Sequence, residues 1–115
     1  MTTVGDCLFC RIAAGDIPAS IVHRDDDVIA FADIHPQAPV HTLVVPVRHY
    51  ANAAELAAAE PALAGQVLAV AGAVAGAAGL DGYRVVFNTG ASAGQSVFHV
   101  HAHVLGGRDL SWPPG

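Results

Sequence analysis

The stretch HVHAHVL, residues 99–105, places a histidine at every second position of a run that is otherwise apolar. Alternation with a period of two is typical of a β-strand, in which every second side chain points to the same face, about 6.5–7 Å from the last. His99, His101 and His103 are therefore predicted to share one face of a strand. The small apolar residues between them would face the other way and pack beneath a helix.

Four other apolar runs predict further strands, because they are rich in β-branched residues and are bounded by turn residues. The predicted strands cover residues 21–24, 28–33, 42–47, 84–88 and 97–105, and the predicted helices cover 7–14, about 53–57 and about 60–78. One long helix among five strands, without alternation of strand and helix, predicts an α+β fold with an antiparallel sheet.

The long predicted helix lies in a segment, residues 61–80, that contains no charged residue. About 20 apolar residues would suffice to cross a membrane. The segment is mostly Ala and Gly and includes Gln66, so its transfer into lipid would be poor and we reject that interpretation. Leu63, Val67, Val70 and Val74 recur at helical spacing, which predicts an amphipathic helix lying on the sheet.

Length and composition predict one compact domain spanning residues 1–115. The chain is 53% hydrophobic and 13% charged, with a mean hydropathy of +0.46. However, 23 residues are Ala and only 6% are aromatic, so few large side chains are available to fill the core. A partner subunit would help to stabilise such a core.

The charge balance excludes several classes of function. The chain contains ten acidic residues, five arginines and no lysine, which gives a net charge of -5. This argues against binding a nucleic-acid backbone, and the absence of lysine excludes Schiff-base chemistry and a Walker A phosphate loop. Met1 to Asp6 has neither the basic nor the apolar part of a secretory signal, so we expect a cytoplasmic location.

The histidine row has two possible chemical uses: chelation of a metal ion such as Zn²⁺, or nucleophilic attack by one imidazole while another handles protons. The segment NTGASAGQS, residues 88–96, lies just before the row and is rich in Gly, Ser and amide side chains. It could cradle a phosphate with neutral donors, and it offers no carboxylate to a metal. An ordinary polar hairpin loop would have a similar composition.

These residues resemble the histidine triad (HIT) superfamily, whose motif is His-φ-His-φ-His-φ-φ with φ apolar. The resemblance extends to the Hint branch through segments along most of the chain. These are Cys7–Arg11, Phe31–Ile34, Pro36–His41, Asn88, Gly94–Ser96, Gly106–Arg108 and Trp112–Gly115. The third histidine, His103, separates the chain from the galactose-1-phosphate uridylyltransferase branch, where Gln is usual.

This resemblance implies hydrolysis of purine nucleoside 5′-phosphoramidates to a nucleoside monophosphate and an amine. His101 would be the nucleophile that forms a covalent nucleotidyl-histidine, which water then hydrolyses. His103 would contact phosphate oxygens or help to protonate the leaving nitrogen, supported by His41. The remaining implied phosphate and leaving-group contacts come from the loop: Asn88, Gly94, Gln95 and Ser96. No catalytic metal is expected.

The resemblance also implies a nucleoside pocket. Asp33 would accept hydrogen bonds from the ribose hydroxyls, a role that suits a carboxylate. Phe31, Ile34 and Leu43 would enclose the base, although all three could equally be ordinary core residues.

A structural zinc site is a second expectation. Cys7 and Cys10 offer two thiolates from one turn, and His49 and His99 would complete a tetrahedral set, as in similar bacterial Hint-like proteins. Free buried thiols or a redox pair are the alternatives. If zinc is bound, His99 is a structural ligand rather than a catalytic group.

The expected assembly is a homodimer whose two sheets join into a ten-stranded sheet. The C-terminal Trp112–Gly115 would pack near the partner's active site. Two other functions remain open: a nucleotide-binding or partner-binding module with weak turnover, and a metal-dependent hydrolase that uses the histidine row as ligands.

Overall fold

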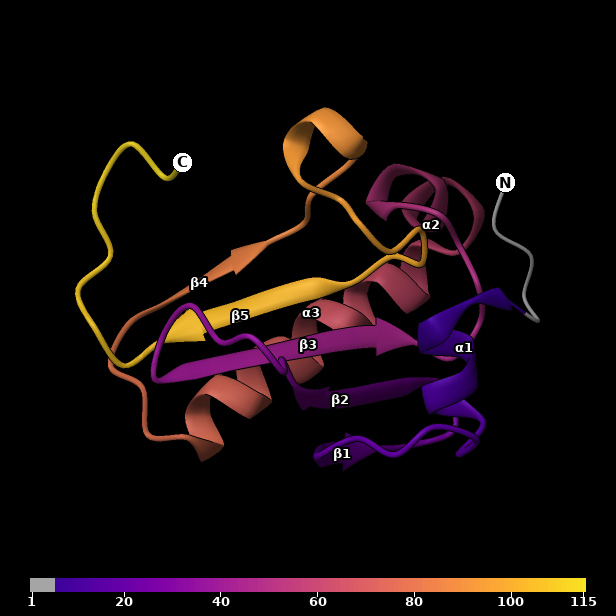
Figure 1. Cartoon of the computed structure of the whole chain (residues 1–115), viewed down its shortest axis with the longest axis horizontal. Coiled ribbons are helices and arrows are strands. Elements are labelled where there is room, and N and C mark those ends of the chain that lie inside the picture. Colours follow the sequence, from indigo (N-terminus) through magenta and orange to yellow (C-terminus); the bar gives the residue numbers. More distant parts are fainter. Residues whose placement is uncertain (1–5) are drawn as a thin grey trace.

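Five antiparallel strands form one sheet in the order β1-β2-β3-β5-β4 (Figure 1), in a computed structural model that describes residues 6–115. The strands are β1 (Ile21–Arg24), β2 (Val28–Ala32), β3 (Val40–Pro46), β4 (Tyr83–Val86) and β5 (Ala102–Gly106). The predicted α+β class with a five-stranded antiparallel sheet is confirmed. The prediction of no secretory signal rests mostly on residues 1–5, which lie outside the described residues.

Two of the three α-helices begin at a side chain that accepts from a free backbone N–H, and the third begins with a proline, which has no N–H. In α1 (Leu8–Ala13), the Cys7 sulfur accepts from the backbone N–H of Cys10. In α2 (Ala53–Ala59), Asn52 Oδ1 accepts from the backbone N–H of Glu55, and the Glu55 carboxylate accepts from the N–H of Ala51, one residue before the cap. The long helix α3 (Pro61–Ala77) follows directly, with its proline in the first turn.

The long helix packs along one face of the sheet through Leu63, Val67, Ala71 and Ala75, which recur every four residues. The sequence predicted Val70 and Val74 for this face, but both are only partly buried at its margin. Small alanines along the centre of the contact let the helix lie close to the strands. Among residues 6–115, no helix is both long and apolar enough to cross a membrane.

The opposite face of the sheet carries α1. Phe9 and Ile12 from this helix pack on Ile29, Phe31 and Val45 of β2 and β3. Figure 1 shows α1 at one end of the strands, on the side away from α3. The sheet is therefore covered along its length on the α3 face and only partly by α1 on the other.

The predicted strand over 97–105 is wrong in its first half, because β5 begins only at Ala102. Residues 97–101 are irregular, and the Val100 N–H bonds to the carbonyl of Tyr50, which belongs to the segment between β3 and α2. The alternation nevertheless survives, since Val100, Ala102 and Val104 all belong to the core beneath α3. The sequence therefore correctly predicts which side chains point toward the core, although it predicts too long a strand.

Candidate active site and metal centre

The three histidines of the row divide between two sites. The His101 and His103 rings are neighbours, with centroids 4.9 Å apart, while the His99 ring lies among the cysteines. Among the described residues, two groups could hold a metal ion, one containing His99 and the other His103, and His101 belongs to neither. The row therefore does not converge on one ion.

His101 has a defined proton arrangement. Its Nδ1 lies 2.8 Å from the carbonyl oxygen of His99, and a carbonyl can only accept, so Nδ1 carries the proton. The neutral ring then has its lone pair on Nε2. Phe9 packs edge-on against this ring, with centroids 5.0 Å apart at 87°. These contacts fix both the orientation of the ring and the nitrogen that is free to react.

His41 and His103 form a second pair whose protons can be assigned in the same way. The backbone N–H of Gln37 donates to His41 Nδ1 over 3.0 Å, so the proton of neutral His41 is on Nε2. His41 Nε2 lies 2.9 Å from His103 Nδ1 and donates to it. His103 therefore carries its own proton on Nε2, where it can serve as a donor.

Burial favours the neutral form of the His101 and His103 imidazoles. Desolvation lowers the pKa of His101 below its usual value. Desolvation, together with the neighbouring His101 and His41, lowers the pKa of His103 to about 4. At neutral pH the site thus presents one imidazole lone pair and one neutral N–H donor, rather than imidazolium charges.

Asp33, His41 and His103 are close enough to suggest a cation site, but their protons argue against one. Asp33 Oδ2 lies 3.4 Å from His41 Nε2. A metal ligand needs a lone pair, and the Gln37 N–H at His41 Nδ1 leaves neutral His41 with its proton on Nε2. This group is therefore better described as a hydrogen-bond network.

The residues predicted to enclose a base divide into two sets. Phe31 pairs with Leu43 across β2 and β3, and Leu43 pairs with His103 across β3 and β5. Phe31 and Leu43 are buried in the core on the α1 side, and the row of paired residues that they form continues to His103. Ile34 is 86% exposed, in the loop after Asp33.

The side chain of Gln95, which was predicted to contact the substrate, instead holds the loop over residues 88–96 in place. The buried Gln95 side chain donates to the carbonyls of Ala51 and Val97 and accepts from the Gly90 N–H. Its amide thus shapes the loop from within. Gly94 has φ +93° and lies near the Asn88 amide, since a Cβ on Gly94 would be 3.9 Å from Asn88 Nδ2. Ser96 is exposed.

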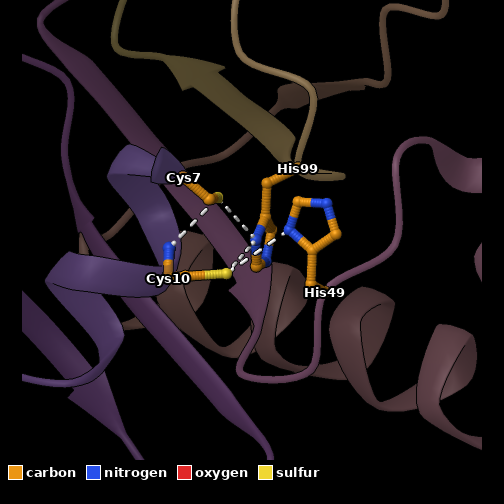
Figure 2. A group of neighbouring side chains, drawn as sticks. All are labelled: Cys7, Cys10, His49 and His99. Carbon is orange, nitrogen blue, oxygen red and sulfur yellow. Dashed lines mark hydrogen bonds between the residues drawn. The ribbon is translucent and has the colours of Figure 1, made fainter. Parts of the chain in front are cut away.

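Cys7, Cys10, His49 and His99 come together at the start of α1 (Figure 2), with all four ligand atoms within 4.8 Å of one another. Cys7 Sγ and Cys10 Sγ each lie 3.3 Å from His99 Nδ1. His49 Nδ1 lies 3.3 Å from Cys10 Sγ. The sequence prediction that these four residues, distant along the chain, are neighbours agrees with this cluster.

The donor chemistry of the cluster fits Zn²⁺. His99 Nε2 donates to the carbonyl of Pro46 over 2.7 Å, which leaves the Nδ1 lone pair directed at the two sulfurs. Two sulfurs and two imidazole nitrogens form a common tetrahedral zinc set. Without a cation, burial and the neighbouring Cys7 raise the pKa of Cys10 to about 12, so metal binding would release thiol protons.

Three parts of the site escaped sequence reasoning. Phe9 lies within a segment that resembles the family, but the sequence analysis did not predict its contact with His101. The Gln37 backbone carries no sequence signal. Arg108, whose guanidinium donates to the Gln37 carbonyl, was noted only as part of a resemblance.

The five-stranded antiparallel sheet with its helices matches solved structures of HIT family proteins. The sequence matches the HIT domain family over residues 14–110, and the chain belongs to this family. The matched region begins after Cys7 and Cys10, so the family match by itself says nothing about the cysteines.

Individual relatives are similar over almost the whole chain. A HIT-like protein of Synechococcus elongatus is 50% identical over 111 residues, covering 96% of this chain and 97% of that protein. The crystal structure of a HIT family hydrolase from Legionella pneumophila has a TM-score of 0.91 at 47% identity, covering 95% of this chain and 99% of that one. A zinc-bound histidine triad family protein from Mycobacterium smegmatis has a TM-score of 0.83 at 33% identity, covering 96% and 83%.

Proposed function

We propose that this protein hydrolyses purine nucleoside 5′-phosphoramidates through a covalent intermediate on His101. The observation that carries the proposal is the arrangement of protons: an imidazole lone pair on His101 Nε2 next to a ring whose proton is on His103 Nε2. A nucleophile beside a neutral donor suits displacement at a phosphorus that bears a leaving amine. Similarity to a protein described as a HIT family hydrolase also supports this class of reaction.

In the first step, His101 Nε2 attacks the phosphorus and the P–N bond to the amine breaks. His103 would contact a phosphate oxygen or pass a proton to the leaving nitrogen, and because the ring is neutral it would take a replacement proton from solvent. The new bond makes the His101 ring cationic, and the His99 carbonyl, which accepts from Nδ1–H, stabilises that charge. Water then attacks the phosphorus and returns one proton to solvent, the P–N bond to His101 breaks to restore the neutral ring, and the nucleoside monophosphate leaves.

The surrounding residues supply a place for each part of this substrate. Asp33 would accept from the ribose hydroxyls, and the base would lie beside the row formed by Phe31 and Leu43, with Ile34 at the rim. Backbone N–H groups of the loop over 88–96, with Asn88 and Ser96, would hold the phosphate and the leaving group. In this scheme Gln95 and Gly94 shape the loop.

We further propose that the four-residue cluster binds Zn²⁺ as a structural ion. Two loop histidines and two residues at the start of α1 supply the ligands, so the ion would fasten α1 to the sheet. The zinc-bound relative from Mycobacterium smegmatis supports this assignment. A cytoplasmic location, as the sequence predicts, would keep both thiols reduced.

A homodimer is also part of the proposal. Within residues 6–115, the outer strand β4 has one unpaired edge, and Tyr83 on β4 and Leu68 on α3 are large exposed apolar residues. Pairing two β4 edges would make the predicted ten-stranded sheet. Trp112, which is 83% exposed, would then lie close to the partner subunit. Sedimentation equilibrium that finds only monomer at micromolar concentration would contradict this assembly.

The decisive experiment is mass spectrometry of protein quenched during turnover of adenosine 5′-phosphoramidate. A covalent nucleotide on His101 is expected, and His101→Ala should lose turnover by at least about a thousandfold while retaining adenosine monophosphate binding. Retained turnover in His101→Ala would refute the nucleophile. No turnover of any phosphoramidate by the intact protein would instead favour a nucleotide-binding or partner-binding module.

A chelator distinguishes the metal-dependent alternative. Brief treatment with EDTA should leave the initial rate unchanged if His101 attacks the phosphorus directly. Immediate loss of activity while the protein is still folded, with recovery on adding the ion, would favour a metal-dependent hydrolase.

A further inference from the structure

We propose that Arg108 is a positioning residue: by holding the backbone of Gln37, it fixes the proton arrangement of the His41–His103 pair. The inference rests on the proposed function, because it explains how His103 presents its Nε2–H to a substrate. Arg108 lies two residues beyond the end of β5, and Gln37 lies in the loop between β2 and β3.

The contact between the two segments is specific to the backbone of Gln37. Arg108 Nε and Nη2 donate to the Gln37 carbonyl oxygen over 3.2 and 3.1 Å. The third guanidinium nitrogen, Nη1, donates to the carbonyl of Asp109 over 3.1 Å. Two donors in a rigid fork hold one carbonyl, while the third bond restrains the guanidinium itself.

The residue before Arg108 brings the two segments together. Gly107 has φ +89°, a conformation that favours glycine. A Cβ at this position would lie only 2.9 Å from Cβ of Pro39. The turn after β5 therefore lies directly against the loop that contains Gln37, and this close approach needs glycine. The hydrogen bonds of Arg108 therefore lie where the turn after β5 packs against the loop between β2 and β3.

The other backbone group of Gln37 is the one that sets the histidine protons. Its N–H donates to His41 Nδ1 over 3.0 Å, and the Asp33 N–H closes the same loop by donating to the His41 carbonyl over 3.0 Å. Gln37 is therefore fixed at its carbonyl by Arg108 while its N–H meets His41. If the loop moved, His41 could place its proton on Nδ1 instead.

A change in the His41 tautomer would change the His103 tautomer, because one hydrogen bond joins the two rings. His41 Nε2 donates to His103 Nδ1 over 2.9 Å only while His41 is protonated on Nε2. With the opposite tautomer of His41, His103 would have to donate through Nδ1 and would present a lone pair at Nε2. That ring could no longer donate to a phosphate oxygen or to the leaving nitrogen.

The test uses Arg108→Ala in the full-length, metal-loaded protein. Imidazole ¹⁵N chemical shifts, measured without substrate, report the tautomers of His41 and His103. We expect both rings to change from mainly Nε2–H to a mixture. The kcat for adenosine 5′-phosphoramidate should fall roughly three- to tenfold, the effect of one orienting hydrogen bond, with little change in KM.

Arg24→Ala is the matched control. Arg24 is also exposed and also donates to a backbone carbonyl, from Nη1 to Ala13 over 3.0 Å, but it lies on β1 near α1 and outside the histidine network. It should leave the ¹⁵N shifts and kcat unchanged. Arg108→Lys keeps the charge without the paired donors and should give an intermediate tautomer shift, which also provides a readout if Arg108→Ala does not fold.

Unchanged His41 and His103 shifts in folded Arg108 variants would overturn the inference, as would equal changes in Arg24→Ala. The NMR readout needs no turnover, so it separates this inference from the proposed function. An altered tautomer with no nucleotide adduct on His101 would refute the proposed reaction while leaving the role of Arg108 in place.

Discussion

The histidines of this protein differ in which ring nitrogen carries a lone pair, and in each case a single hydrogen bond determines that nitrogen. His99 and His101 both donate to carbonyl oxygens, but His99 does so through Nε2 and His101 through Nδ1. The lone pair of His99 consequently points at two sulfurs, whereas that of His101 is on Nε2. The partner of the other nitrogen therefore prepares two chemically equal residues for different proposed roles, a metal ligand for His99 and a nucleophile for His101.

His103 should make the folded state sensitive to acid. Its pKa is about 4 in the folded protein, below the ordinary 6.5, mainly because of desolvation. The unfolded chain therefore binds this proton first as the pH falls, and stability is lost progressively between about pH 6.5 and pH 4. Urea unfolding at about pH 7 and pH 5 should show lower stability at the lower pH.

A non-titrating variant isolates this effect from other acid-sensitive groups, including the cysteine cluster. His103→Asn keeps those groups unchanged, so its stability should fall less over the same pH interval. Equal losses in the variant and the original protein would show that His103 is protonated in the folded state as readily as in the unfolded chain.

Among the structural elements, a short helix and short connecting segments position the residues of the two candidate sites. Helix α1 has only six residues, and the Cys7 that caps it is also a member of the cysteine–histidine cluster. The segment before α2 contains the carbonyl of Tyr50, which anchors Val100, and that of Ala51, which anchors Gln95. These short connections hold the irregular residues 97–101 where a longer β5 would otherwise have continued.

The side-chain cap at the start of α2 can be tested by mutation. Asn52→Ala removes the acceptor for the Glu55 N–H, which lies 2.9 Å away, and should lower the free energy of unfolding by about 1 kcal/mol. Asn52→Asp retains an acceptor and should be close to the original protein. Both changes are measurable by urea denaturation, and an Asn52→Ala protein of unchanged stability would show that the cap contributes nothing.

In the whole molecule, the cysteine–histidine cluster and the histidine site lie on the side of the sheet away from α3, and His99 links them. Its ring belongs to the cluster, and its carbonyl orients His101. Phe9 of α1 contacts both the His99 and His101 rings, with centroids 6.1 and 5.0 Å apart. If the cluster binds the proposed zinc ion, removal of that ion would therefore also affect the position of His101.

Removal of zinc should lower the thermal midpoint. At a free zinc concentration about 100 times Kd, bound metal stabilises the folded state by about 2.7 kcal/mol, which corresponds to roughly 10 °C for a domain of this size. Differential scanning calorimetry with and without a chelator measures the change. Cys10→Ser, which lacks one thiolate, should respond far less, and equal midpoints with and without metal in the original protein would contradict a structural ion.

Local patterns in the sequence were sufficient for the fold class and for the two faces of the histidine row. Both depend on periodicity, which the chain carries in neighbouring residues. The membership of the cysteine–histidine cluster came instead from a family resemblance, because His49 and His99 are distant in sequence from the two cysteines. Tertiary structure alone decided where β5 begins, which alanines of α3 meet the sheet, and which nitrogen of each histidine holds its proton. Those outcomes depend on backbone groups such as the Tyr50 carbonyl and the Gln37 N–H, which are alike at nearly every residue and differ only in where folding puts them.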